Sequence, residues 1–306
     1  MTVDSSPRTR YAWLGPVAAL SLVTVVLAGC STGTYTAPTS GAAPLATPSS
    51  SSPQSTAVPS TPNAGKRLPG TVQALVALPT GHVLAATSDG LYDVAPDGSN
   101  ARVGTTQTDL TSLARDSDGT LYASGHDNAT TGSAALGLLR SSDNGSTWTV
   151  VTGQGRLDLH ALAVRGSTLV GRSDDRLIVS QDGGTRWQPA ATVAADSLTL
   201  DTSTLWVTSI GGLARSDDDG AQLRHVADAP TLRWGALATD RTVWGIDTTG
   251  RIWRREGPDT WSRVSHVPVD GVTAFTALDA HHAVVATGTT LTWIADSSQA
   301  STADTA

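Results

Sequence analysis

Three stretches of this sequence place serine, aspartate and glycine at alternating positions, residue types that serve either an enzyme's active site or a tight turn. The clearest copy is SSDNGSTW, which contains Ser141, Asp143, Gly145, Thr147 and Trp148. An aspartate at this position can accept hydrogen bonds from the N–H groups of its own turn. Glycine can take positive φ there at little steric cost. We therefore expect a structural turn rather than an active site.

The stretch recurs twice with fewer of its residues. The copy SQDGGTRW supplies Ser180, Asp182, Gly184 and Trp187. The copy SDDDGAQL supplies Ser216, Asp218 and Gly220. Recurrence at a near-regular interval indicates a structural repeat, because repeated units of this length are typical of propellers and solenoids.

Each copy follows the third of three short apolar runs, and such a group of runs occurs six times. The runs are rich in Val, Leu, Thr and Trp and are separated by Gly, Asp, Ser and Pro, which is typical of antiparallel strands joined by tight turns. A leucine in the first run marks each unit. These leucines are Leu75, Leu113, Leu162, Leu198, Leu237 and Leu278. Residues 67–296 are therefore predicted to be all-β.

The repeated stretch resembles the Asp-box, or BNR repeat, of sialidase-like β-propellers in bacteria. The resemblance implies a six-bladed β-propeller of four-stranded antiparallel blades, with seven blades as the alternative. It places each Asp-box in the hairpin between the third and fourth strands, with its Trp over the seam between neighbouring blades. The last unit lacks a fourth run, and the segment around Arg67–Leu68 is a candidate to supply that strand.

The N-terminal region has the composition of an export signal. Arg8 and Arg10 precede an apolar run that ends in Leu-Ala-Gly-Cys, and Cys30 is the only cysteine of the chain. This ending resembles the bacterial lipobox, which implies cleavage before Cys30, its acylation, and anchoring to the extracytoplasmic face of the cell membrane. An uncleaved transmembrane helix is the alternative.

Four regions follow from this organisation. Residues 1–29 are predicted to be a lipoprotein signal peptide and residues 67–296 the propeller. Residues 30–66 and 297–306 are rich in Ser, Thr, Pro and Ala, and are predicted to be a disordered tether and a disordered tail, because they have little to bury.

The repeat also predicts where a ligand would bind. If the Asp-boxes lie on one rim, the turns between second and third strands lie on the opposite rim, with the segments that lead into each first strand. Concave mouths of this kind are frequent ligand sites. The candidate binding residues on this rim are Arg156, His160, Arg172, Asp174, Arg233 and Trp234.

Three functions compete for that rim. The first is non-catalytic binding of an envelope protein or glycan. The second is a sialidase-like exo-glycosidase with its site at the propeller mouth, for which Arg156, Arg172 and Arg233 could form a substrate clamp. The third is a metal-binding module built on acidic runs such as Asp174-Asp175, although the oxygen ligands have no regular spacing.

We favour binding, because the Tyr–Glu pair that the sialidase resemblance requires has no counterpart here. No catalytic residue, metal or cofactor is assigned. The formal net charge of −7 argues against nucleic acid as a partner. We expect a monomer attached to the membrane through its lipidated N-terminus.

Overall fold

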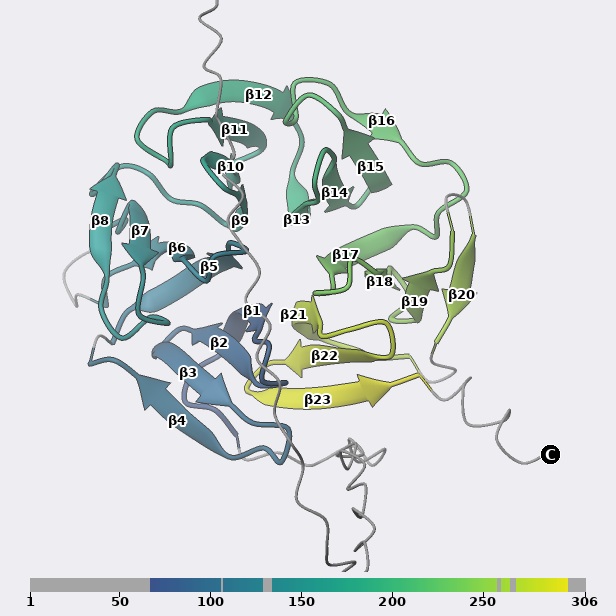
Figure 1. Ribbon diagram of the computed structural model, residues 1–306, viewed down its shortest axis with the longest axis horizontal. Coiled ribbons are helices and arrows are strands. Elements are labelled where there is room, and N and C mark those ends of the chain that lie inside the picture. The colour runs from purple at the N-terminus through teal and green to yellow at the C-terminus, as the bar shows by residue number, and fades with distance from the viewer. Residues whose placement is uncertain (1–66, 106, 129–133, 258–259, 265–267, 297–306) are drawn as a thin grey trace, which may run out of the picture. The chain divides into compact units, whose positions relative to one another are not determined.

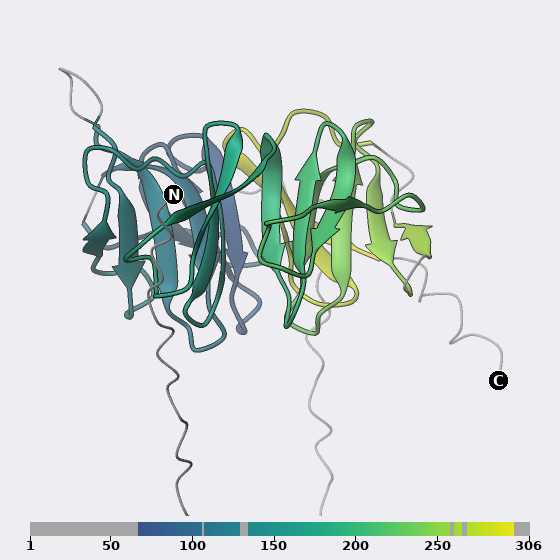
Figure 2. The same ribbon diagram turned by 90° about the horizontal axis from the view of Figure 1, so that it is seen from above.

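The described part of the chain is an all-β ring of six antiparallel sheets, here called blades (Figure 1). The computed structural model describes residues 67–105, 107–128, 134–257, 260–264 and 268–296. The prediction of a six-bladed β-propeller is confirmed. Its strands run between two rims of turns (Figure 2).

Each blade is a meander in which strands adjacent in sequence pair in space. Blade 1 contains β1 (Val72–Ala77), β2 (Val83–Thr87), β3 (Gly90–Val94) and β4 (Asn100–Val103). Blade 2 contains β5 (Asp109–Arg115), β6 (Leu121–His126), β7 (Leu138–Ser141) and β8 (Thr149–Thr152). Blade 3 contains β9 (Ala161–Arg165), β10 (Thr168–Ser173), β11 (Arg176–Ser180) and β12 (Gln188–Thr192).

The remaining blades follow the same order. Blade 4 contains β13 (Ala195–Leu200), β14 (Leu205–Ser209), β15 (Gly212–Ser216) and β16 (Arg224–His225). Blade 5 contains β17 (Leu232–Leu237), β18 (Val243–Asp247), β19 (Ile252–Arg255) and β20 (Trp261–Arg263). Blade 6 contains β21 (Val272–Ala277), β22 (His282–Thr287) and β23 (Thr290–Ala295). The first strand of each blade lies innermost (Figure 1).

The core is divided among the six seams between neighbouring blades. Each seam contains its own cluster of buried apolar side chains. The second strands are almost entirely buried, as in β2 and β22, because both of their faces pack against other blades. This explains why those strands read as continuous apolar runs rather than as alternating ones.

The ring closes where blade 1 meets blade 6, and β1 lies beside β21 (Figure 1). The N–H groups of Leu68 and Val72 donate to the carbonyls of Thr289 and Gly288, at 2.9 and 2.8 Å. The Leu68 side chain is only 4% exposed and packs in a cluster that includes Trp293. The expectation that Arg67–Leu68 supplies a fourth strand is therefore wrong. The segment fixes the end of the β22–β23 hairpin, and blade 6 has three strands within the described residues.

Several sequence predictions concern residues outside the described ranges. They are the signal peptide at 1–29, Cys30, the tether to residue 66 and the tail at 297–306. Within the described ranges, no helix has the length and apolar character needed to cross a membrane.

Candidate functional site

The three repeated stretches, here called the box turns (residues 141–148, 180–187 and 216–223), each join the third strand of a blade to its fourth. In the first, Ser141 Oγ donates to Asp143 Oδ1 at 2.7 Å and accepts from the Gly145 N–H at 2.9 Å. Thr147 donates to the Asp143 carboxylate twice, through its N–H at 2.9 Å and its hydroxyl at 2.6 Å. The serine and the aspartate thus bond within their own turn.

These bonds stabilise the ionised form of the Asp143 carboxylate. Hydrogen bonds from the Thr147 hydroxyl and N–H, and then from Ser141, lower the pKa of Asp143 to about 2. A carboxylate with this pKa is a poor proton acceptor near neutral pH, since the turn favours its ionised form. The geometry suits a turn more than acid–base chemistry.

The other two box turns repeat the geometry around their own serine. Gly184 N–H donates to Ser180 Oγ at 2.9 Å, and Arg186 N–H to Asp182 at 2.9 Å. The third turn has equivalent bonds from Gly220 to Ser216 at 2.8 Å and from Gln222 to Asp218 at 2.9 Å. Hydrogen bonds to these carboxylates lower the pKa of Asp182 and of Asp218.

The box glycines also allow close approach between blades. Gly145 and Gly184 have φ of 87° and 91°. A Cβ at Gly145 would lie 2.2 Å from a methyl of Leu91 in blade 1, and one at Gly184 would lie 2.1 Å from a methyl of Leu138 in blade 2. Each glycine therefore serves both the backbone of its turn and the packing of the preceding blade.

The tryptophans of these turns lie at the seams between blades. Trp148 packs against the cluster shared by blades 1 and 2, and Trp187 against the cluster shared by blades 2 and 3. Trp187 also donates its indole N–H to the carbonyl of Gly184 at 2.9 Å. Their area is buried in structural contacts between blades.

The molecule has two rims with different turns. The box face carries the box turns and the turns between first and second strands. The opposite rim carries the turns between second and third strands and the segments leading into each first strand. The central channel has a cavity of about 100 Å³ lined by His160 and Trp234. His160 and Trp234 place this cavity on the opposite rim. We call it the narrow mouth because of its small volume.

The arginines predicted on the opposite rim do not form an anion clamp. Arg233 binds Asp196 through two hydrogen bonds, at 2.7 and 3.0 Å, which raise the pKa of Arg233. Arg172 donates to the carbonyl of Asp174, in a turn where Asp174 has φ of 53°. Arg156 is exposed in the loop before β9. Two of the three guanidinium groups, those of Arg172 and Arg233, thus donate hydrogen bonds to acceptors on the rim itself.

His160 belongs to a cluster that spans two blades. The Nε2 atoms of His126 and His160 lie 3.2 and 3.0 Å from one oxygen of Asp158. The other carboxylate oxygen, Oδ1, is buried and accepts no hydrogen bond within the described residues. The arrangement fixes the His160 ring at the narrow mouth.

The opposite rim also exposes an apolar side chain that the sequence reasoning missed. Ile210 lies in the turn between β14 and β15 and is 79% exposed. Gly212, in the same hairpin, lies beside Thr231, which precedes β17 and its residues Arg233 and Trp234. The available signal was an isoleucine at the tip of the turn TSIGG, where polar residues are usual.

A second and larger cavity opens at the box face. It has a volume of about 660 Å³ and is lined by the C-terminal halves of the first strands and the turns that follow them. We call it the wide mouth. Six residues line both mouths and form the waist between them. They are Leu75, Leu113, Leu162, Leu198, Gly235 and Phe275.

The residues of the waist show that two of the leucines used to mark the repeat were assigned to the wrong positions. In blades 5 and 6 the equivalent positions are Gly235 and Phe275, not Leu237 and Leu278. Leu237 lies on the wall of the wide mouth, and Leu278 packs at the seam of blades 6 and 1. The error arose because leucine identity, rather than strand position, defined the repeat.

The acidic runs do not assemble a metal centre in the described part of the chain. No group of three or more His, Cys, Asp or Glu side chains there is arranged to hold a metal ion. Asp174 and Asp175 lie in an exposed turn.

Comparison with known proteins supports the fold but assigns no family. No protein-family model matches this sequence, and no curated protein matches it. A gluconolactonase from Xanthomonas campestris is similar in structure, with a TM-score of 0.57, 14% identity, and coverage of 75% of this chain and 87% of that chain. A chain of a nidogen/laminin complex gives a TM-score of 0.53 and 16% identity, covering 67% of this chain and 84% of that one.

Some matched structures are much longer than this chain. An ancestral GH74 enzyme is matched over 77% of this chain but only 39% of its own, with a TM-score of 0.45 and 18% identity. Of the three structures described, the two with TM-scores above 0.5 are an enzyme and a chain of a protein complex. At such low identity they establish the propeller fold alone.

Proposed function

We propose that this chain is a lipid-anchored, extracytoplasmic propeller of the Asp-box type that binds an envelope protein and performs no catalysis. The observation that carries the proposal is Ile210, which is 79% exposed on the opposite rim. An exposed aliphatic side chain surrounded by polar groups offers a protein partner an apolar contact with a polar surround, the arrangement found at the centre of protein interfaces. A glycan would instead favour a broad exposed aromatic face, whereas Trp234 is half-buried between blades.

Anchoring through Cys30 completes the proposal. The single cysteine, the preceding apolar run and the Leu-Ala-Gly-Cys ending support acylation at this residue. Cys30→Ala should move the protein from the membrane fraction to the soluble fraction. Retention of the variant in the membrane would contradict lipid anchoring without affecting the docking proposal.

The glycosidase alternative is less well supported by the tyrosine chemistry. Tyr92 is 4% exposed, and its hydroxyl donates to Asp89 at 2.8 Å. Burial and this hydrogen bond both raise the pKa of Tyr92, which opposes formation of a nucleophilic phenolate. Turnover of a fluorogenic sialoside that disappears in Arg233→Ala would nevertheless overturn the preference for binding.

The docking surface is tested by three variants of the full-length protein, one of them a control. Ile210→Asp should abolish capture of an envelope protein that the wild type retains, and Trp234→Ala should weaken it. Val150→Asp, at an apolar site on β8 that is 42% exposed, should leave capture unchanged. Equal loss in Val150→Asp would indicate a nonspecific effect of the introduced charge and would refute docking at this rim.

A further inference from the structure

The wide mouth combines apolar walls with charged groups at its opening. Apolar side chains such as Val76, Val164 and Leu200 line the walls of the cavity, and the waist forms its floor. Its volume of about 660 Å³ lies within the usual range for small-molecule sites. The cavity lies on the box face and is therefore separate from the docking surface proposed above.

Three arginines from three blades line this opening. Arg115 ends β5, Arg165 ends β9, and Arg241 lies in the turn after β17. Two carboxylates, those of Asp116 and Asp201, line the same opening. The site therefore gathers positive groups in a protein whose net charge is negative.

Two of these arginines have partners of their own. Arg165 donates to the carbonyl of Asp201 and to the carboxylate of Asp219, both at 2.9 Å. Arg241 donates to the carboxylate of Asp201 at 2.5 Å. The Asp116 carboxylate accepts the N–H of Gly166 at 3.0 Å. These bonds tie neighbouring turns together and hold the opening in shape.

Arg115 differs from the other two. Its guanidinium has no hydrogen-bond acceptor or ion-pair partner among the residues that the structure describes, and its Nε is buried without an acceptor. Asp118 is close enough for Arg115 to contribute to lowering the Asp118 pKa, after the hydrogen bonds from Thr120 and the charge of Arg140. The Nε is enclosed by protein, so an anion in the cavity would bind Arg115 through the terminal N–H groups of its guanidinium, which no carboxylate of the described residues occupies.

We propose that the wide mouth binds an amphipathic carboxylate, with its charged group at Arg115 and its apolar body against the leucines of the waist. A guanidinium matches the two oxygens of a carboxylate, and the apolar walls favour a ligand with an aliphatic or aryl body. Two sources present this chemistry: the C-terminal residue of a peptide and a free organic acid.

The test uses full-length protein in detergent micelles and four probes, with dissociation constants measured by ligand-observed NMR. N-acetyl-leucine represents a peptide terminus and hexanoate a free acid. N-acetyl-leucinamide and hexanamide are their uncharged counterparts. We expect the dissociation constant of each acid to be lower than that of its amide by a factor of about ten or more, because the amide loses a charge-assisted hydrogen bond. The acid that binds more tightly identifies the source.

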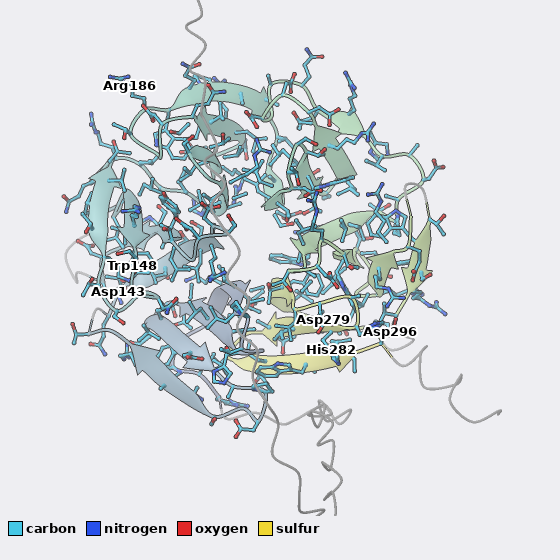
Figure 3. The ribbon with its side chains drawn as sticks, in the orientation of Figure 1. Asp143, Trp148, Arg186, Asp279, His282 and Asp296 are labelled. Carbon is cyan, nitrogen blue, oxygen red and sulfur yellow. The ribbon has the colours of Figure 1, made fainter. Side chains whose placement is uncertain are left out.

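Variants distinguish a binding site from a structural feature. Arg115→Gln should weaken acid binding about tenfold without lowering the melting temperature, whereas Arg115→Lys should retain only part of it, because an ammonium keeps the charge but not the paired donors. The matched control is Arg186→Gln, which removes one positive charge from the box face at the outer edge of the ring, where Arg186 has an 88% exposed side chain (Figure 3).

Three results would overturn the proposal: no binding of either acid, equal affinity for acid and amide, or equal weakening in Arg186→Gln. Ile210→Asp should leave acid binding unchanged. A failure at the wide mouth is therefore distinguishable from a failure of docking on the opposite rim.

Discussion

Blades 2 to 4 and the closing blades 5, 6 and 1 maintain the same architecture by different means. In blades 2 to 4 each box turn binds itself within eight residues and places a glycine against the preceding blade. At the seam between blades 5 and 6, contacts between residues distant in sequence hold the neighbouring blades together. Arg254 donates to the carbonyl of Ala280 at 2.8 Å and pairs with Glu256 and Asp296. The difference shows that a propeller can lose its turn motif where long-range contacts replace it.

The two regions lie on different sides of the ring. Asp143 and Trp148 mark the first box turn, and Asp279, His282 and Asp296 mark the closing side (Figure 3). There the indole N–H of Trp244 donates to the carbonyl of Asp279 at 3.0 Å. A long-range contact that occurs once has no equivalent elsewhere in the ring, whereas the box turn occurs three times. We therefore expect a substitution on the closing side to lower the stability of the fold more than one in a box turn.

Arg254→Met should give the largest effect, a loss of about 3–5 kcal/mol in the free energy of unfolding, because it removes a guanidinium from a buried charge network. The side chains of Arg254 and Asp296 are 10% and 4% exposed. Urea denaturation measures the loss. The control Arg224→Met, at an exposed pair with Asp217, should cost about 0–1 kcal/mol. Similar losses in both variants would remove the distinction between the two regions.

Leu68→Ala should cost about 2–4 kcal/mol, because it leaves a cavity at the seam that closes the ring. Ile210→Ala, an aliphatic truncation at a 79% exposed position, should change stability very little. The same denaturation experiment compares them. If Leu68→Ala were as mild as Ile210→Ala, ring closure would not depend on this segment.

Gly184→Ala should cost about 1–3 kcal/mol, from the strain of a positive φ and the clash with Leu138. Gly183→Ala is the matched control: Gly183 has φ of 73°, but a Cβ there would meet nothing within 4 Å. The difference between the variants measures the contact between blades alone. Equal melting temperatures would mean that the glycine serves only its own turn.

The smallest expected effect is the pH dependence of the first box turn. The ordinary pKa of Asp143 is 3.8, and the turn lowers it to about 2. The stabilisation is therefore fully present above about pH 4 and is lost as the pH falls through about 2. Asp143→Asn should flatten the decline in unfolding free energy between pH 5 and pH 2. Asp175→Asn, in an exposed turn, serves as the control, and an equal effect there would exclude a specific role for the box carboxylate.

The sequence predicted the fold better than it predicted a ligand site. Alternating apolar runs and the three box turns gave six blades and their strand order, because those signals lie within a few neighbouring residues. The same reasoning directed attention to the opposite rim. It could not predict that Arg233 would pair with Asp196, nor that the wider of the two channel mouths would open at the box face.

What the sequence by itself determined was therefore local: the strands, the turns that cap them, and the self-contained hydrogen bonds of Ser141 and Asp143. Only the tertiary structure decided that Leu68 reaches the last blade and that Gly235 and Phe275 complete the waist. It also decided that Arg115 lies at the opening with no hydrogen-bond or ion-pair partner among the described residues. The physical reason is sequence separation. A turn's hydrogen bonds are fixed by residues at most four positions apart, whereas a seam or a channel is made by side chains that only the closed ring brings together.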